Sequence, residues 1–204
     1  MRKRLFLFVL LAIAAIVIGC ARKATNTTAD HSGMDHSKMD HSNMKSSPNA
    51  ATAPYDLQFL DTMSAHHQAA IQMAGPCESK AQHAEVNALC GNIISSQQKE
   101  IADMQSWRDK WFPSAAPAMN MEMAGMNDSM KRMDMKKLAT LSGNEFDLEF
   151  IKQMMPHHQG AVVMANEALQ KSTKPEIKAL ANAIIKAQEA EIGQMKQWQA
   201  EWSG

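Results

Sequence analysis

Two pairs of adjacent histidines, each set among methionines, are the residues of this chain best suited to chemistry. One pair is His66 and His67, and the other is His157 and His158. Imidazole nitrogen and thioether sulfur are donors that soft transition metals favour. We therefore predict metal ligands at the four histidines and at the methionines that accompany them, which are Met63, Met73, Met104, Met154, Met164 and Met195.

Both histidine pairs belong to a segment that occurs twice in the chain. The pattern Asp-x-x-Phe-x-x-x-Met-x-x-His-His-Gln-x-Ala-x-x-Met-Ala starts at Asp56 and again, 91 residues later, at Asp147, with no insertion or deletion. The same offset carries Trp111 onto Trp202. Each copy spans about 56 residues, and a unit of that size buries too little apolar surface to be stable alone. The two copies must therefore pack together.

The apolar residues of each copy predict two helices joined by a short turn. Phe59, Met63, His66, Ala70 and Met73 fall on one face of the first helix. A short turn requires the two helices to be antiparallel. We expect an all-α four-helix bundle over residues 55–204, made of hairpin one at 56–111, a methionine-rich linker at 112–141 and hairpin two at 142–204.

Antiparallel hairpins also place particular residues at the same level. In hairpin one the histidine pair lies opposite residues 97–101. Hairpin two places His158 near Glu191 and Met154 near Met195. Adjacent histidines diverge by about 100° around a helix, so one of each pair faces the interior and the other a seam between helices.

Two features of this pattern allow more than one interpretation. Methionine at helical spacing is also typical of an ordinary core, whereas a buried histidine needs partners for both ring nitrogens. Pro156 lies inside a predicted helix where the first copy has Ala65. Either the helix restarts at the proline, or a bend re-aims the second histidine pair and makes the two sites unequal.

The donor set indicates which metals fit. No Glu-x-x-His occurs in the chain, which argues against a di-iron bundle. Thioether and imidazole together favour Cu(I), with Ag(I) as a mimic, and a histidine-rich segment can hold Cu(II). In the linker we include as candidate ligands Met119, Met121, Met123 and Met126.

The N-terminal region reads as an export signal followed by a tether. A basic start and an apolar run of residues 5–18 predict a signal peptide over residues 1–19. Residues 20–54 contain few bulky apolar side chains and are expected to be disordered. Three Asp-His-Ser-x-Met units in this tether add the candidate ligands His31, Met34, His36, Met39, His41 and Met44. Flexible segments of this kind would capture ions, and the bundle would hold them.

The net charge and the cysteines indicate which binding partners and which cysteine chemistry to expect. Without residues 1–19 the chain keeps 18 Lys and Arg against 21 Asp and Glu, a net charge of −3. This balance gives no electrostatic footprint for nucleic acid. Cys77 and Cys90 flank the turn of hairpin one, so in an oxidising compartment we expect a disulfide. The alternative is that both are thiolate ligands of Cu(I).

Two short patterns resemble known ones. Val17-Ile18-Gly19-Cys20 resembles a bacterial lipobox, which implies cleavage before Cys20 and its lipidation, with outer-membrane sorting if the cell is Gram-negative. The duplicated Phe-x-x-x-Met-x-x-His-His-Gln-x-Ala-x-x-Met-Ala resembles the CopM-like family of exported bacterial proteins, long labelled a domain of unknown function. That resemblance covers residues 56–202 and implies a ferritin-like four-helix bundle and, for some members, periplasmic copper binding linked to copper resistance.

The function expected from these observations is that of a binding protein rather than an enzyme. The prediction is a lipoprotein of the cell envelope, facing the periplasm, that binds mainly Cu(I) for sequestration or delivery. A copper exporter or another periplasmic copper protein is the candidate partner. The alternatives are a metal-dependent oxidase acting on Cu(I) and a structural envelope bundle whose His and Met side chains only fill the core.

Overall fold

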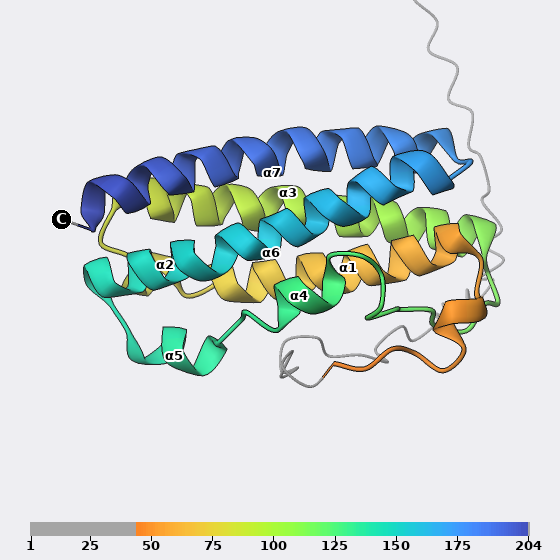
Figure 1. Ribbon diagram of the computed structural model, residues 1–204, viewed down its shortest axis with the longest axis horizontal. Helices are drawn as coiled ribbons and strands as arrows, with labels where there is room; N and C mark the ends of the chain where they lie inside the picture. The colour runs from red at the N-terminus through yellow and green to blue at the C-terminus, as the bar shows by residue number, and fades with distance from the viewer. Residues whose placement is uncertain (1–43, 204) are drawn as a thin grey trace, which may run out of the picture. The chain divides into compact units, whose positions relative to one another are not determined.

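Four long helices form an antiparallel bundle, as the sequence predicts. The structure, a computed structural model, describes residues 44–203, and this part of the chain contains no strand. The long helices are α1 (Tyr55–Ala74), α3 (Ala84–Trp111), α6 (Gly143–Lys171) and α7 (Pro175–Trp202). α1 pairs with α3 and α6 with α7, and α1 packs against α6 to join the two hairpins (Figure 1).

The turn of hairpin one contains an extra helical turn that the periodicity does not reveal. α1 ends at Gly75-Pro76, and the one-turn helix α2 (Cys77–Lys80) follows before α3 begins. Cys77 in α2 and Cys90 in α3 are joined by a disulfide, with their Cα atoms 6.3 Å apart. Both side chains are buried in the hydrophobic core. The two sulfur atoms are thus already bonded to each other in this structure.

α6 runs without interruption through Pro156. The interpretation that the helix restarts at this residue is therefore wrong. Proline lacks the N–H that the carbonyl of Lys152 would accept from in a regular helix. The helix as a whole packs against both α1 and α7.

Residues 44–54, which the prediction includes in the tether, lie beside the methionine-rich linker just before α1. The 3-10 helix η3 (Ala50–Thr52) lies in this segment. This segment is hydrogen-bonded to the linker through one backbone and one side-chain group, since Ser47 N donates to Met119 O at 2.8 Å and Ser46 Oγ accepts from Met121 N at 2.9 Å. These hydrogen bonds offset part of the conformational entropy that is lost when the segment becomes ordered, which composition alone does not reveal.

The methionine-rich linker is packed onto the bundle. It includes two short helices, α4 (Met126–Met130) and α5 (Met135–Thr140). Its buried methionines belong to the same core as the long helices and are Met121, Met123, Met126, Met130 and Met133. Hydrogen bonds from Ala118 N to Asp61 and from Asn120 N to Thr62 fasten it to α1.

The two ends of the bundle are closed by repeat-related contacts. The ring of His83, before α3, stacks on Trp202 with centroids 3.7 Å apart. Lys174, before α7, places its ammonium 4.8 Å from the centroid of Trp111. His83 matches Lys174, and Trp111 matches Trp202, at the 91-residue offset. The residue before the second helix of each hairpin therefore covers the indole at the end of the other hairpin.

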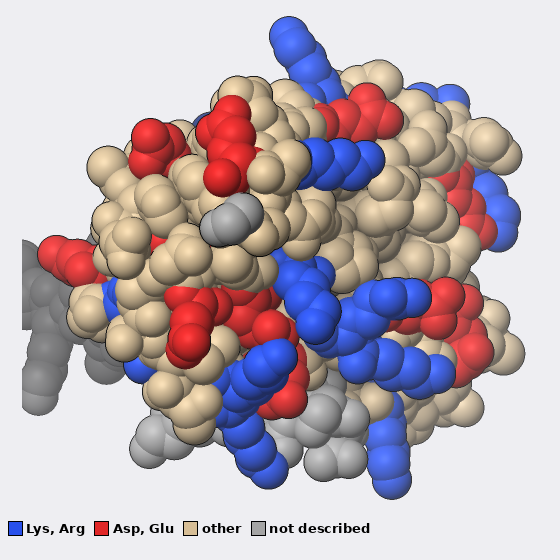
Figure 2. All heavy atoms as spheres, turned by 60° about the vertical axis from the view of Figure 1, so that its left-hand side comes forward, with Lys and Arg blue, Asp and Glu red and all other residues tan. Residues whose placement is uncertain are grey.

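The surface mixes charges of both signs. Figure 2 shows Lys and Arg side chains interleaved with Asp and Glu over the face that it presents. Among the described residues, no helix is long and apolar enough to span a membrane.

The disulfide should contribute measurably to stability. Cys77 and Cys90 correspond to Ala168 and Ala181 in copy two, so replacing both by alanine copies a packing that the chain already uses. Because the bridge closes a short loop, we expect the double variant to lose about 3 kcal/mol in the free energy of unfolding, measured by urea denaturation. Free thiols that alkylate in the unreduced, purified protein would contradict the bridge.

Candidate metal centre

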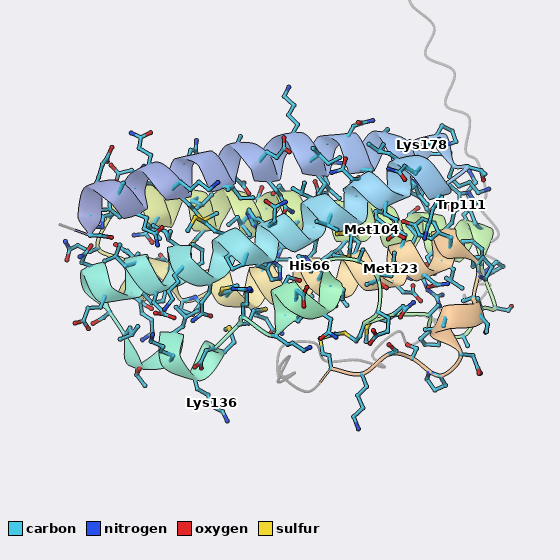
Figure 3. The ribbon with its side chains drawn as sticks, viewed as in Figure 1. His66, Met104, Trp111, Met123, Lys136 and Lys178 are labelled. Carbon is cyan, nitrogen blue, oxygen red and sulfur yellow. A yellow bond between two sulfur atoms is a disulfide. The ribbon has the colours of Figure 1, made fainter. Side chains whose placement is uncertain are left out.

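Two histidine rings from different hairpins lie against each other at the middle of the bundle. His66 of α1 and His157 of α6 have ring centroids 3.8 Å apart and planes inclined by 30°. Both side chains are fully buried. Figure 3 shows His66 midway along the bundle, beside α4. The pattern of one interior histidine in each pair is therefore confirmed.

The second histidine of each pair bonds a glutamate on the partner helix of its own hairpin. His67 Nε2 lies 2.6 Å from Glu100 Oε2, and His158 Nε2 lies 2.6 Å from Glu191 Oε2. The histidines are fully buried, while each glutamate side chain keeps 18 % of its surface exposed. The register expected for both hairpins is confirmed by these two bonds.

Pro156 does not make the two histidine pairs different in local geometry. The rings of His66 and His67 are 6.3 Å apart and inclined by 58°. Those of His157 and His158 are 6.4 Å apart and inclined by 55°. The substitution of proline for Ala65 thus leaves the ring arrangement of the two copies nearly equal.

The linker, in contrast, distinguishes the copies. His66 Nε2 is 3.0 Å from Ser129 Oγ in α4. The serine hydroxyl donates to Met126 O at 2.8 Å, so its oxygen accepts from the His66 N–H. This hydrogen bond places the proton of the neutral ring on Nε2 of His66.

Methionines lie one turn from the histidines in both hairpins. Because His67 faces Glu100, the antiparallel register puts Met63 level with Met104, and the Ser64 hydroxyl lies 3.8 Å from Met104 Sδ. The same register puts Met154 level with Met195 in hairpin two. All four thioethers are fully buried. We call each set a Met-His-Glu-Met layer, with members Met63, His67, Glu100 and Met104 in hairpin one and Met154, His158, Glu191 and Met195 in hairpin two.

Other predicted ligands lie elsewhere. Met73 is seven residues from His66, about 10 Å along the helix, and Met164 is equally far from His157. Both are buried core residues. Of the linker candidates, Met119 is partly buried against the core, and the buried ones are Met121, Met123 and Met126. Met44 also packs against the core, while the described residues do not include Cys20, His31, Met34, His36, Met39 or His41.

Several buried imidazole nitrogens in the layers and beside them have no hydrogen-bond partner. They include Nδ1 of His66, His67 and His158. Where Nε2–H donates to a carboxylate, Nδ1 carries the lone pair that a metal can use, and the carboxylate behind the ring increases its basicity. The imidazoles and thioethers present thus fit a soft metal ion. Among residues 44–203 no three His, Cys, Asp or Glu side chains converge as a metal-binding group.

Sequence reasoning assigned no site role to three of these residues. It did place His158 near Glu191, and Glu100 matches Glu191 at the repeat offset, so both glutamates were expected close to the predicted layer. Ser129 carries no such signal, because the linker is not repeated. Only its position on α4 brings it to His66.

Burial makes His66 a poor proton acceptor. Desolvation, and then the positive charges that His67 and His158 carry when protonated, hold the pKa of His66 well below its usual value, while a backbone interaction with His157 opposes them. Ser129 faces the ring from α4 and contributes no charge. The ring is therefore neutral at physiological pH and available for a metal without releasing a proton.

The metal-free protein should lose stability in mild acid. His66 stays neutral when folded but binds a proton when unfolded, so stability is complete above the unfolded pKa of about 6.5 and falls as pH decreases below it. We expect His66→Gln to reduce the slope of the unfolding free energy against pH below 6.5 by about 1.4 kcal/mol per pH unit, the value for one proton. Urea denaturation at several pH values measures this, and equal slopes in the two proteins would contradict it.

Comparison with known proteins places this arrangement in a family. The model of a domain of unknown function, DUF305, matches residues 19–108 and 56–199. The structure of CopM in its Cu(II)-bound form is 43% identical, with 74% of this chain and 99% of that chain covered and a TM-score of 0.64. CopM in its Cu(I)-bound form is 41% identical, covering 74% of this chain and 100% of that chain, with a TM-score of 0.63.

A more distant relative shares the fold. A protein described as a secreted DUF305 protein of Streptomyces coelicolor is 30% identical, covering 77% of this chain and 97% of that chain, with a TM-score of 0.64. No curated protein matches the chain. The duplicated histidine pattern, the four-helix bundle and these matches together show that the chain belongs to the DUF305 family and is CopM-like within it.

Proposed function

We propose that this protein binds copper in the cell envelope, mainly as Cu(I), and sequesters it or passes it to a partner. One observation carries the proposal: each Met-His-Glu-Met layer contains a fully buried imidazole, His67 or His158, whose Nδ1 has no hydrogen-bond partner, next in sequence to the stacked rings of His66 and His157. Support comes from CopM, whose structures include Cu(I)-bound, Cu(II)-bound and Ag-bound forms.

The chemistry of the layers favours the reduced ion. Cu(I) is soft and accepts few ligands, and a neutral imidazole with one or two thioethers satisfies it. The thioethers do not titrate, and burial keeps His66, which lies beside the layer of hairpin one, neutral. Full burial of the histidines and methionines of the layers would also exclude the water that favours Cu(II). Each glutamate would orient its histidine by holding Nε2.

The location is part of the same proposal. The signal peptide and lipidation at Cys20 would export the protein and anchor it to a membrane. The Asp-His-Ser-x-Met units would then capture ions near that surface and hand them to the bundle. A copper exporter or another periplasmic copper protein would supply or receive the metal.

An oxidase remains the main rival function. It would turn over O₂ as it converts Cu(I) to Cu(II), whereas a binder takes up copper with no sustained O₂ consumption. Oxygen uptake by the protein with excess Cu(I) and a reductant that is inert to O₂ therefore separates the two. Sustained O₂ consumption faster than that of the same concentration of free copper would contradict the proposed binding function and favour the oxidase.

Removing the thioethers without disturbing the packing tests the layers directly. We expect Met63→Leu with Met154→Leu to weaken Cu(I) binding by at least tenfold, because leucine has a similar volume but no sulfur donor. Competition with a chromophoric Cu(I) chelator measures the affinity. The tether histidines and methionines should be replaced beforehand, so that only the folded part binds.

Met133→Leu is the matched control, since Met133 is a buried linker methionine outside the two layers. Its affinity for Cu(I) should equal that of the parent protein. If the control and the layer variant bind alike, the thioethers of the layers are core residues and the copper sites lie elsewhere.

The two glutamates provide a test of equivalence. Glu100→Gln and Glu191→Gln each replace a carboxylate by a neutral group of the same shape behind a histidine. We expect each to weaken Cu(I) binding by about 10-fold to 100-fold. Because the two layers have matching geometry, the two losses should agree. A large loss in one variant and none in the other would show that a single hairpin holds the metal.

A further inference from the structure

The linker reaches the histidine pair through a contact that only glycine permits. Gly125, at φ +89°, and Gly160 of α6 pack backbone to backbone. A Cβ on Gly160 would lie 2.5 Å from Gly125 O and 2.6 Å from Ser129 Cβ. Copy one has Ala69 at the position of Gly160. The second copy thus departs from the repeat where α4 needs room.

This close approach is what brings Ser129 to His66. Ser129 lies on α4 one turn after Gly125, and its hydroxyl bridges Met126 O and His66 Nε2. The serine is almost fully buried. The hydrogen bond therefore forms in an environment without water. If the bond to Ser129 is lost, no solvent molecule can take its place at the ring nitrogen.

Among the elements around His66, α4 is the one that can move at least cost. It is a five-residue helix, whereas α1 and α6 are 20 and 29 residues long. Separating the two long helices would expose most of the core, whereas lifting α4 would expose the three side chains that it buries, Met126, Ser129 and Met130. Beyond α4 the linker is fastened to α6 again, because Asp134 N donates to Gln153 Oε1 at 2.7 Å.

We propose that the segment Gly125–Met130 is a lid over the stacked rings of His66 and His157. Ser129 is then a positioning residue, which holds the proton on His66 Nε2 while the lid is docked. The inference rests on the proposed metal binding. Metal enters and leaves only while the lid is lifted, so the rates of uptake and of release both scale with the fraction of molecules that are open. The lid would thereby slow metal uptake and release at one of two repeat-related histidine pairs.

The sharpest test adds one methyl group. Gly160→Ala places a Cβ against Gly125 and Ser129 and should displace the lid. Gly193→Ala is the control, because a Cβ there meets nothing within 4 Å and the gain in helix propensity is the same. With Ag(I) as the probe, we expect Gly160→Ala to take up and release the ion at least tenfold faster than the wild type. Gly193→Ala should match the wild type.

Hydrogen exchange shows whether the lid has moved. In Gly160→Ala the amides of residues 118–134 should exchange faster, and those of α3 and α7 should not. Faster exchange at 118–134 with unchanged Ag(I) rates would overturn the lid. A wild type that takes up no Ag(I) would instead refute the proposed function, and this inference with it.

Ser129→Ala is the gentler variant and decides the matter if Gly160→Ala does not fold. Loss of one hydrogen bond should raise the Ag(I) uptake rate about fivefold. In ¹⁵N spectra of the metal-free wild type, the His66 ring should carry its proton on Nε2, and Ser129→Ala should shift this tautomer ratio. A wild-type ring protonated on Nδ1, or a ratio that Ser129→Ala leaves unchanged, would overturn the positioning role.

Discussion

Burial of four imidazole rings inside the bundle is the constraint on which the rest of the structure depends. A polar ring in a dry core must find partners for its nitrogens or remain destabilising. His67 and His158 meet this need with Glu100 and Glu191, which lie at the edge of the bundle where their carboxylates reach solvent. These two bonds set the register within each hairpin, and the stacking of His66 on His157 sets the register between them.

The bundle compensates for this polar centre at its periphery. The indoles of Trp111 and Trp202 are covered by Lys174 and His83, and His83 also bonds the buried carboxylate of Asp147. A disulfide fastens the turn of hairpin one, and buried linker methionines extend the core across α1 and α6. Unsatisfied nitrogens in the middle are thus retained by a scaffold that is well packed elsewhere, the arrangement expected where polar groups serve binding rather than stability.

Much of this could be predicted because a repeat contains its own evidence. The matched positions of Met154, His158, Glu191 and Met195 with their counterparts one copy earlier identify the layers without any structure, and hairpin geometry then gives the level of each residue. The linker could not be predicted in the same way. Its composition resembles that of a flexible segment, and its order comes from side chains of α1, such as Asp61 and Thr62, whose partners are far away in sequence.

The sequence by itself determined the duplicated hairpins, the antiparallel register and the set of soft donors, because helical periodicity and a constant offset act locally along the chain. Only the tertiary structure decided which donors meet. The crossing of α1 and α6 brings His66 and His157 into contact but leaves Met73 and Met164 two turns away. It also decided that the two copies differ, since the contact of Gly125 with Gly160 joins residues on separate elements and places Ser129 at one histidine pair. No local pattern can specify such a contact, because it depends on how whole helices pack.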